Sequence, residues 1–134
     1  MKSFDPSAIV PYAIVPLSNQ EAIELCDQRD AGRARHNMPP MTTTQAIEFQ
    51  KHVARERADE AWLLSNTPMG TVFDVLGVSH MVVSHPHRVD TPERPGPGPW
   101  QVQVFAPDGR GGIDRSLLTC RQLRAMLEPG FTAP

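Results

Sequence analysis

The clearest pattern of apolar and polar positions runs from about residue 42 to residue 64. Successive 100° steps place five apolar side chains of this stretch within one arc, as in a helix with one buried face. Charged residues collect on the opposite side. The sequence therefore predicts a long amphipathic helix, ended by loop-forming residues in 65–70. The five apolar positions are Ile47, Ala54, Ala58, Ala61 and Trp62.

Shorter helices are predicted before and after the long one. Ser18 and Glu21 have the spacing of a capping box, which begins the first of them, and Gly32 is a stop signal. Thr119 is positioned to cap the last helix, which ends before Pro129. The apolar stripe of this last helix consists of Cys120, Leu123, Met126 and Leu127.

Between the long helix and the last helix the apolar period changes to two, which is typical of β-strands. The stretches 71–76 and 78–84 are rich in β-branched residues, and Gly77 marks a bulge, bend or turn between them. Residues 100–104 alternate cleanly, and we expect residues 113–118 to return as their hairpin partner.

Strands clustered between helices predict an α+β fold. We expect a small antiparallel or mixed sheet of three to four strands, packed against two N-terminal helices and one C-terminal helix. Its interior should be built around Trp62 and Trp100. Residues 91–99 contain four prolines and two glycines, so they predict an extended surface loop without ladder hydrogen bonds.

The first 17 residues predict an extended apolar arm in front of a single α+β domain, residues 18–134. Two similar pentapeptides, each with a proline, follow one another in 8–17, and prolines disfavour a central strand. The arm either covers the chain's own sheet or docks on a second chain, by strand exchange or by main-chain pairing. Its candidate partner-binding residues are Tyr12, Ile14 and Val15.

Composition sets outer limits on these expectations. The chain has 134 residues, of which 40% are hydrophobic and 21% charged, close to globular averages. It contains no apolar run of about 20 residues and no signal-peptide pattern, so we expect no membrane partner. Two cysteines imply no disulfide framework, which predicts a reducing, cytoplasmic location. The excess of Arg over Lys, with abundant Pro and Ala, suggests a GC-rich bacterial genome.

A histidine cluster is the strongest candidate for chemistry. His85 and His87 lie on one side of an extended chain and could share a divalent metal ion with Asp90. His80 or Glu93 would be further ligands. In the alternative interpretation, these histidines decorate a strand end and its exposed loop.

Other catalytic patterns are missing from the sequence. It has no Gly-x-Ser-x-Gly elbow, no phosphate-binding loop of the Walker type and no Cys-x-x-Cys. Cys120 lies in an apolar stripe, which is typical of a core thiol rather than a nucleophile. The net charge of −2 argues against a nucleic-acid partner. Two arginine pairs keep that alternative open: Arg33 with Arg35, and Arg121 with Arg124.

These observations favour a small non-enzymatic binding or accessory protein of a bacterium or mobile element, with no cofactor expected. Its partner would be another protein or a second copy of itself. The alternative is a metal-binding protein or metal-dependent enzyme that uses His80, His85 and His87. The third hypothesis is a DNA-associated regulator.

Overall fold

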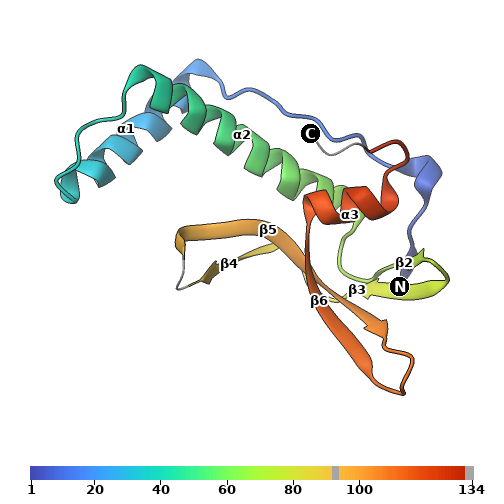
Figure 1. Ribbon diagram of the computed structural model, residues 1–134. Helices are drawn as coiled ribbons and strands as arrows, with labels where there is room; N and C mark the ends of the chain where they lie inside the picture. Colours follow the sequence, from blue (N-terminus) through green and yellow to red (C-terminus); the bar gives the residue numbers. More distant parts are fainter. Residues whose placement is uncertain (92–93, 132–134) are drawn as a thin grey trace. The chain divides into compact units, whose positions relative to one another are not determined.

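The computed structural model describes residues 1–91 and 94–131; for residues 90, 91 and 94–96 it describes the backbone alone. Three helices and a mixed sheet make up this part of the chain, which confirms the α+β class (Figure 1). The helices are α1 (Asn19–Arg35), α2 (Thr43–Asn66) and α3 (Cys120–Leu127). The strands are β1 (Lys2–Ser3), β2 (Thr71–Val75), β3 (Val78–Val82), β4 (His87–Thr91), β5 (Arg94–Pro107) and β6 (Ile113–Thr119). No helix among the described residues is long and apolar enough to span a lipid bilayer.

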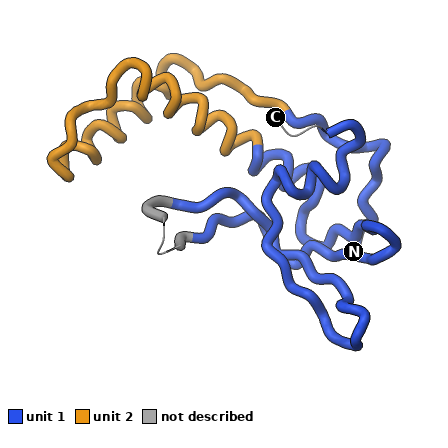
Figure 2. The backbone as a smooth tube through the Cα atoms, viewed as in Figure 1, with its two compact units in different colours: residues 1–12, 59–134 blue, residues 13–58 orange. Residues whose placement is uncertain are grey.

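The chain forms two compact units, which Figure 2 distinguishes by colour. Residues 1–12 and 59–134 form the first, called the sheet unit here. Residues 13–58 form the second, called the helical unit, which holds α1 and the first part of α2. These boundaries differ from the predicted division after Leu17, because the first half of the arm belongs to the sheet unit and the second half to the helical unit.

The sheet has the strand order β1-β2-β3-β5-β4, and β6 also pairs with β5. The β1–β2 pair is parallel and the others are antiparallel, so the sheet is mixed. The predicted hairpin of residues 100–104 with 113–118 is confirmed, since Val102 is opposite Leu118. Gly77 forms the predicted turn between β2 and β3 together with Leu76, and both have positive φ angles, 78° and 51°.

Residues 94–99 belong to β5, so the prediction of a loop over the whole of 91–99 was wrong for this part. The prolines of the segment occupy alternate positions, 95, 97 and 99. The segment still pairs with β4, where Asp90 is opposite Pro97. The register of this pair shifts between Arg88 and Asp90 and again between Asp90 and Thr91, so the pairing is irregular where prolines remove amide donors. Residues 92 and 93 lie outside the described part of the chain.

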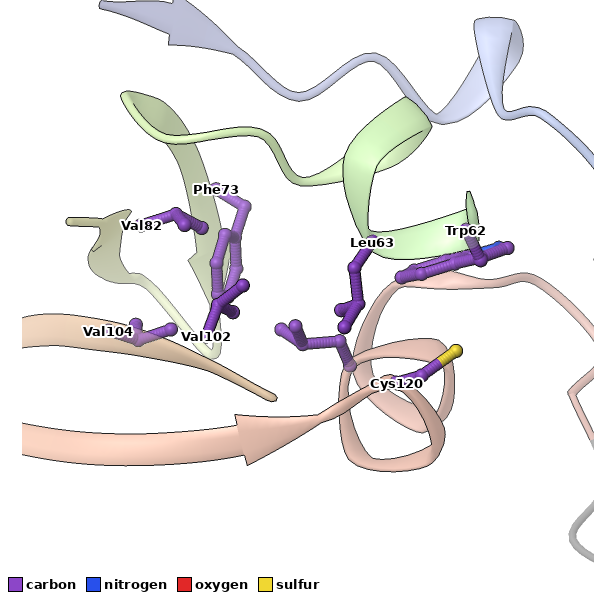
Figure 3. Packing of buried hydrophobic residues seen from close by; sticks show 8 residues of the cluster. Trp62, Leu63, Phe73, Val82, Val102, Val104 and Cys120 are labelled. Carbon is purple, nitrogen blue, oxygen red and sulfur yellow. The ribbon is translucent and has the colours of Figure 1, made fainter. Parts of the chain in front are cut away.

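The core of the sheet unit forms where the end of α2 and α3 meet one face of the sheet (Figure 3). Trp62 is almost fully buried and Trp100 is partly buried against the same cluster, as predicted. Leu63 is completely buried whereas Ala61 is exposed, which differs from the predicted arc. The larger side chain contributes more, since burying a leucine stabilises the fold by about 2 kcal/mol. The buried cluster consists of Trp62, Leu63, Phe73, Val82, Val102, Val104, Cys120 and Leu123.

Both shorter helices begin at the predicted cap residues, and the capping box predicted at Ser18 and Glu21 is formed only in its Ser18 half. Ser18 Oγ accepts a hydrogen bond from the Glu21 amide at 3.2 Å and begins α1. The Glu21 side chain forms an ion pair with Arg57 at 2.6 Å. At the start of α3, Thr119 and Gln122 form the full reciprocal capping box.

Candidate functional site

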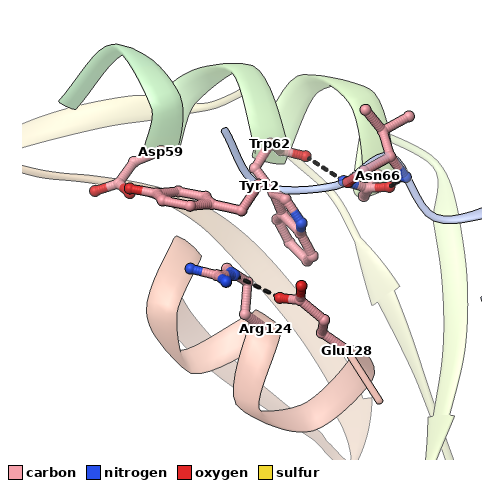
Figure 4. A network of polar contacts seen from close by, with 7 residues as sticks. Tyr12, Asp59, Trp62, Asn66, Arg124 and Glu128 are labelled. Atoms are coloured by element: carbon pink, nitrogen blue, oxygen red, sulfur yellow. Dashed lines mark hydrogen bonds and ion pairs between the residues drawn. The ribbon is translucent and has the colours of Figure 1, made fainter. Parts of the chain in front are cut away.

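The first half of the arm is fixed to its own unit by polar contacts (Figure 4). The Tyr12 hydroxyl donates to Asp59 Oδ1 at 2.7 Å, and the Arg124 guanidinium lies 4.0 Å from the centre of the Tyr12 ring. The Val10 amide donates to Asn66 Oδ1 at 2.7 Å, and Asn66 Nδ2 donates back to the Val10 carbonyl at 3.0 Å. Tyr12, a predicted partner-binding residue, therefore contacts α2 and α3 of its own chain.

Next to this network lies Cys120, which the sequence predicts to be a core thiol rather than a nucleophile. It is 1% exposed. Burial, together with the nearby Asp59 carboxylate, raises the pKa of the Cys120 thiol to about 12. The thiolate is the nucleophilic form of cysteine, so at neutral pH this residue is an inert core thiol.

The second half of the arm forms a groove with α2 inside the helical unit. This arm groove encloses about 390 Å³ and is lined mainly by apolar side chains. Ile14 and Ile47 are each about half exposed, whereas Ala54 is buried at its floor. Val15, the third predicted partner-binding residue, is 71% exposed and is not one of the lining residues. The lining consists of Ile14, Pro16, Leu17, Ile47, Gln50, Lys51, Ala54 and Arg55.

Two cationic side chains lie on the α2 side of the arm groove. Lys51 and Arg55 are one helical turn apart, and no carboxylate is among the lining residues. Lys51 approaches Glu48 at 3.9 Å, but both side chains are 62% exposed, so this pair holds the ammonium only weakly. The groove therefore combines an apolar floor with a positive margin, an arrangement that suits an aliphatic side chain flanked by a carboxylate.

The predicted histidine cluster is spread over two strands and the segment between them. The His80 ring stacks on Phe73 with 5.1 Å between ring centres, and its Nδ1 lies 2.9 Å from the Val78 carbonyl oxygen. His87 Nδ1 lies 3.0 Å from the carbonyl oxygen of the exposed His85. His80 thus packs at the edge of the core, on the face that carries Phe73.

Within the described residues, no three His, Cys, Asp or Glu side chains are grouped to hold a metal ion. The Asp90 side chain and the whole of Glu93 lie outside the described residues. The metal site of His85, His87 and Asp90 therefore stays a prediction.

Two of the four arginines of the DNA hypothesis, Arg33 and Arg124, make contacts within the chain. Arg33 Nε donates to the Pro39 carbonyl at 2.8 Å and so closes the loop after α1. Arg124 forms an ion pair with Glu128, and its guanidinium also lies 4.7 Å from the ring centre of Phe131. Both side chains therefore have a structural role in the fold.

Comparison with known proteins leaves the site to be interpreted from its own geometry, since no protein family, no curated protein and no solved structure matches the chain.

Sequence reasoning found the arm side of the groove through the apolar repeat in 8–17, but not the α2 side. Ile47 was expected in the apolar arc of the long helix, and Lys51 was not singled out. Ile47 is about half exposed although it lies in this apolar arc, and it lines the groove between the arm and α2. The sequence does not show this, because it does not say where the arm lies against α2.

Proposed function

We propose that this chain is a small non-enzymatic binding protein, which works by presenting the arm groove to another protein. The observation that carries the proposal is the exposure of three aliphatic side chains at and beside the groove, Ile14, Val15 and Ile47. Exposed apolar side chains around a hollow are typical of interaction sites. The raised pKa of Cys120 also supports it, because that thiol is unsuited to nucleophilic chemistry near neutral pH.

The charge around the groove suggests the chemistry of the partner. Lys51 favours an acidic segment, because its exposed pair with Glu48 is weak, and the apolar floor at Ala54 favours an aliphatic anchor. The partner is therefore expected to present a leucine- or isoleucine-like side chain next to aspartate or glutamate. Binding should weaken as salt concentration rises, because exposed charge pairs are screened.

Photo-crosslinking from the arm tests this proposal. The full chain carries a benzophenone amino acid in place of Val15, and in a control chain the same probe replaces Ile23. Ile23 is also apolar and 57% exposed in the helical unit, but it does not line the groove. We expect an adduct of defined mass at position 15 and none of that mass at position 23.

Competition shows whether the adduct depends on the groove. Excess unlabelled natural chain should suppress it, whereas an Ile14→Asp/Ile47→Glu chain should not. Circular dichroism must first show that this variant keeps its helix content. Equal adducts at positions 15 and 23, or equal competition by both unlabelled chains, would contradict the proposal.

A further inference from the structure

The sheet has a second face, opposite the one that carries the core. Strand register places Val72, Met81 and Phe105 side by side on β2, β3 and β5. The same row continues to Arg115 on β6, and Leu117 lies two residues further along that strand, on the same face. We call this surface the open face.

Side-chain contacts confirm which residues share each face. The Arg115 guanidinium lies 5.4 Å from the centre of the Phe105 ring, so both belong to the open face. The stacked pair Phe73 and His80 belongs to the other face, against which α3 and the end of α2 pack (Figure 3). Within the described sheet unit, α3 and the end of α2 both lie on the core side, so neither of these segments covers the open face (Figure 1).

The apolar part of the open face extends to the outermost strand. Ile113 is 59% exposed and Leu117 45% exposed, both on β6. In a sheet with one solvated face, polar residues on that face usually alternate along each strand with apolar residues on the core face. Here valine, methionine, phenylalanine, leucine and isoleucine share the face with Ser79, Gln101 and Gln103, and this apolar content is typical of an interface.

The charges of the open face lie on different strands, β2 and β6. In β2, β3, β6 and residues 97–107 of β5, the register assigns one acidic residue and one basic residue to this face, Asp74 and Arg115. Asp74 lies on β2 and Arg115 on β6, with β3 and β5 between them. Opposite charges thus flank an apolar centre.

We infer that the open face packs on the open face of a second copy, around a two-fold axis that runs parallel to the strands. Such an axis places β2 of each copy over β6 of the other. Asp74 of one copy then lies two residues along the strand from Arg115 of the other, an offset that the long arginine side chain spans to form two equivalent ion pairs beside Val72, Met81 and Phe105. This self-complementarity is what an isologous dimer requires. The arrangement is a sheet-on-sheet packing, with layers about 10 Å apart. It is independent of the arm groove, which belongs to the helical unit.

A charge swap tests the dimer on the full chain. Sedimentation equilibrium over a concentration series should give a mass twice 14.8 kDa for the natural chain. Asp74→Arg alone, or Arg115→Asp alone, places like charges opposite each other and should weaken dimerisation about tenfold or more. The double variant D74R/R115D restores both pairs with reversed sign, so its dissociation constant should return towards that of the natural chain.

Control variants separate the interface from the fold. Arg110→Asp makes the same charge change as Arg115→Asp, but in the turn after β5, and should leave the dimer intact. Met81→Glu places a carboxylate in the apolar centre and should give a monomer with unchanged circular dichroism. Ile14→Asp/Ile47→Glu, which disables the arm groove, should still dimerise.

Two results would overturn the inference. One is a natural chain that sediments as a monomer at every concentration. The other is a double variant whose defect equals the sum of the two single defects, since that additivity indicates damage to the fold rather than a reciprocal pairing.

Discussion

Tyr12 and Asp59 are joined by a hydrogen bond of 2.7 Å between the phenol and the carboxylate, across 47 positions of sequence. The same ring lies under the Arg124 guanidinium, so one side chain of the arm contacts both α2 and α3. This bond explains why the arm divides at Tyr12. Residues before it belong to the sheet unit, and the exposed aliphatic residues that follow belong to the helical unit.

Two substitutions of Tyr12 should distinguish the stability that its hydrogen bond contributes from the stability that ring packing contributes. Tyr12→Phe removes only the hydroxyl and should lower the free energy of unfolding by about 1 to 2 kcal/mol, because Asp59 loses a charge-assisted bond. Tyr12→Ala also removes the ring and should cost about 3 kcal/mol or more. Urea denaturation measures both values, and equal stability of the three chains would contradict this account.

Alkaline pH should destabilise the fold through Cys120. The unfolded thiol titrates near pH ~8.5, whereas the folded thiol has a pKa of about 12. Between these values the unfolded chain releases a proton that the folded chain keeps, so stability falls as pH rises, by at most about 1.4 kcal/mol per pH unit. Burial also raises the pKa of Tyr12, which steepens the fall above pH ~10.

Cys120→Ala should flatten this pH dependence although it lowers the stability itself. Urea denaturation at several pH values between 7 and ~10.5 measures the slope. Val82→Ala is a suitable control, because it also truncates a fully buried side chain but removes no titratable group. An unchanged slope in Cys120→Ala would show that another group is responsible.

The indole nitrogen of Trp62 is buried and has no hydrogen-bond partner among the described residues. Leaving a buried donor without a partner costs about 1 to 3 kcal/mol. Trp62→Phe removes that cost along with part of the ring, so its net loss should be about 1 kcal/mol or less. Trp62→Ala should lose about 3 to 5 kcal/mol. Thermal unfolding of the two variants distinguishes the polar effect from the packing effect.

Gly98 allows β5 to approach β4 closely. A Cβ atom at this position would lie 2.5 Å from the Val89 carbonyl oxygen, so Gly98→Ala must push the strands apart. We expect amides of β4 to lose protection from hydrogen exchange in this variant. Gly32→Ala is the matched control in α1, where the added atom meets only ordinary contacts; it should stabilise the chain by about 0.5 to 1 kcal/mol.

The sequence correctly predicted those elements that depend on residues close together in the chain. Ser18 and Thr119 cap helices as expected, because a cap depends on residues three positions apart. The hairpin of β5 and β6 follows from the turn that begins at Pro107. The proline-rich start of β5 was missed because composition indicates a loop, whereas its place in the sheet depends on pairing with β4.

The candidate site was predictable only in part. Ile14 was singled out for its place in an apolar arm, but its neighbours across the groove lie more than 30 positions away in the sequence, at Ile47 and Lys51. Helical periodicity assigns a residue to a face of its own helix and does not say which segment will cover that face.

The alternating prolines of β5 have a consequence for behaviour at high concentration. A strand edge with regularly spaced amide donors can recruit a foreign strand and so begin aggregation. The prolines at positions 95, 97 and 99 have no amide hydrogen, so this part of β5 offers fewer donors to an incoming strand. Replacing them would add amide donors here, a change that favours edge-to-edge pairing of strands.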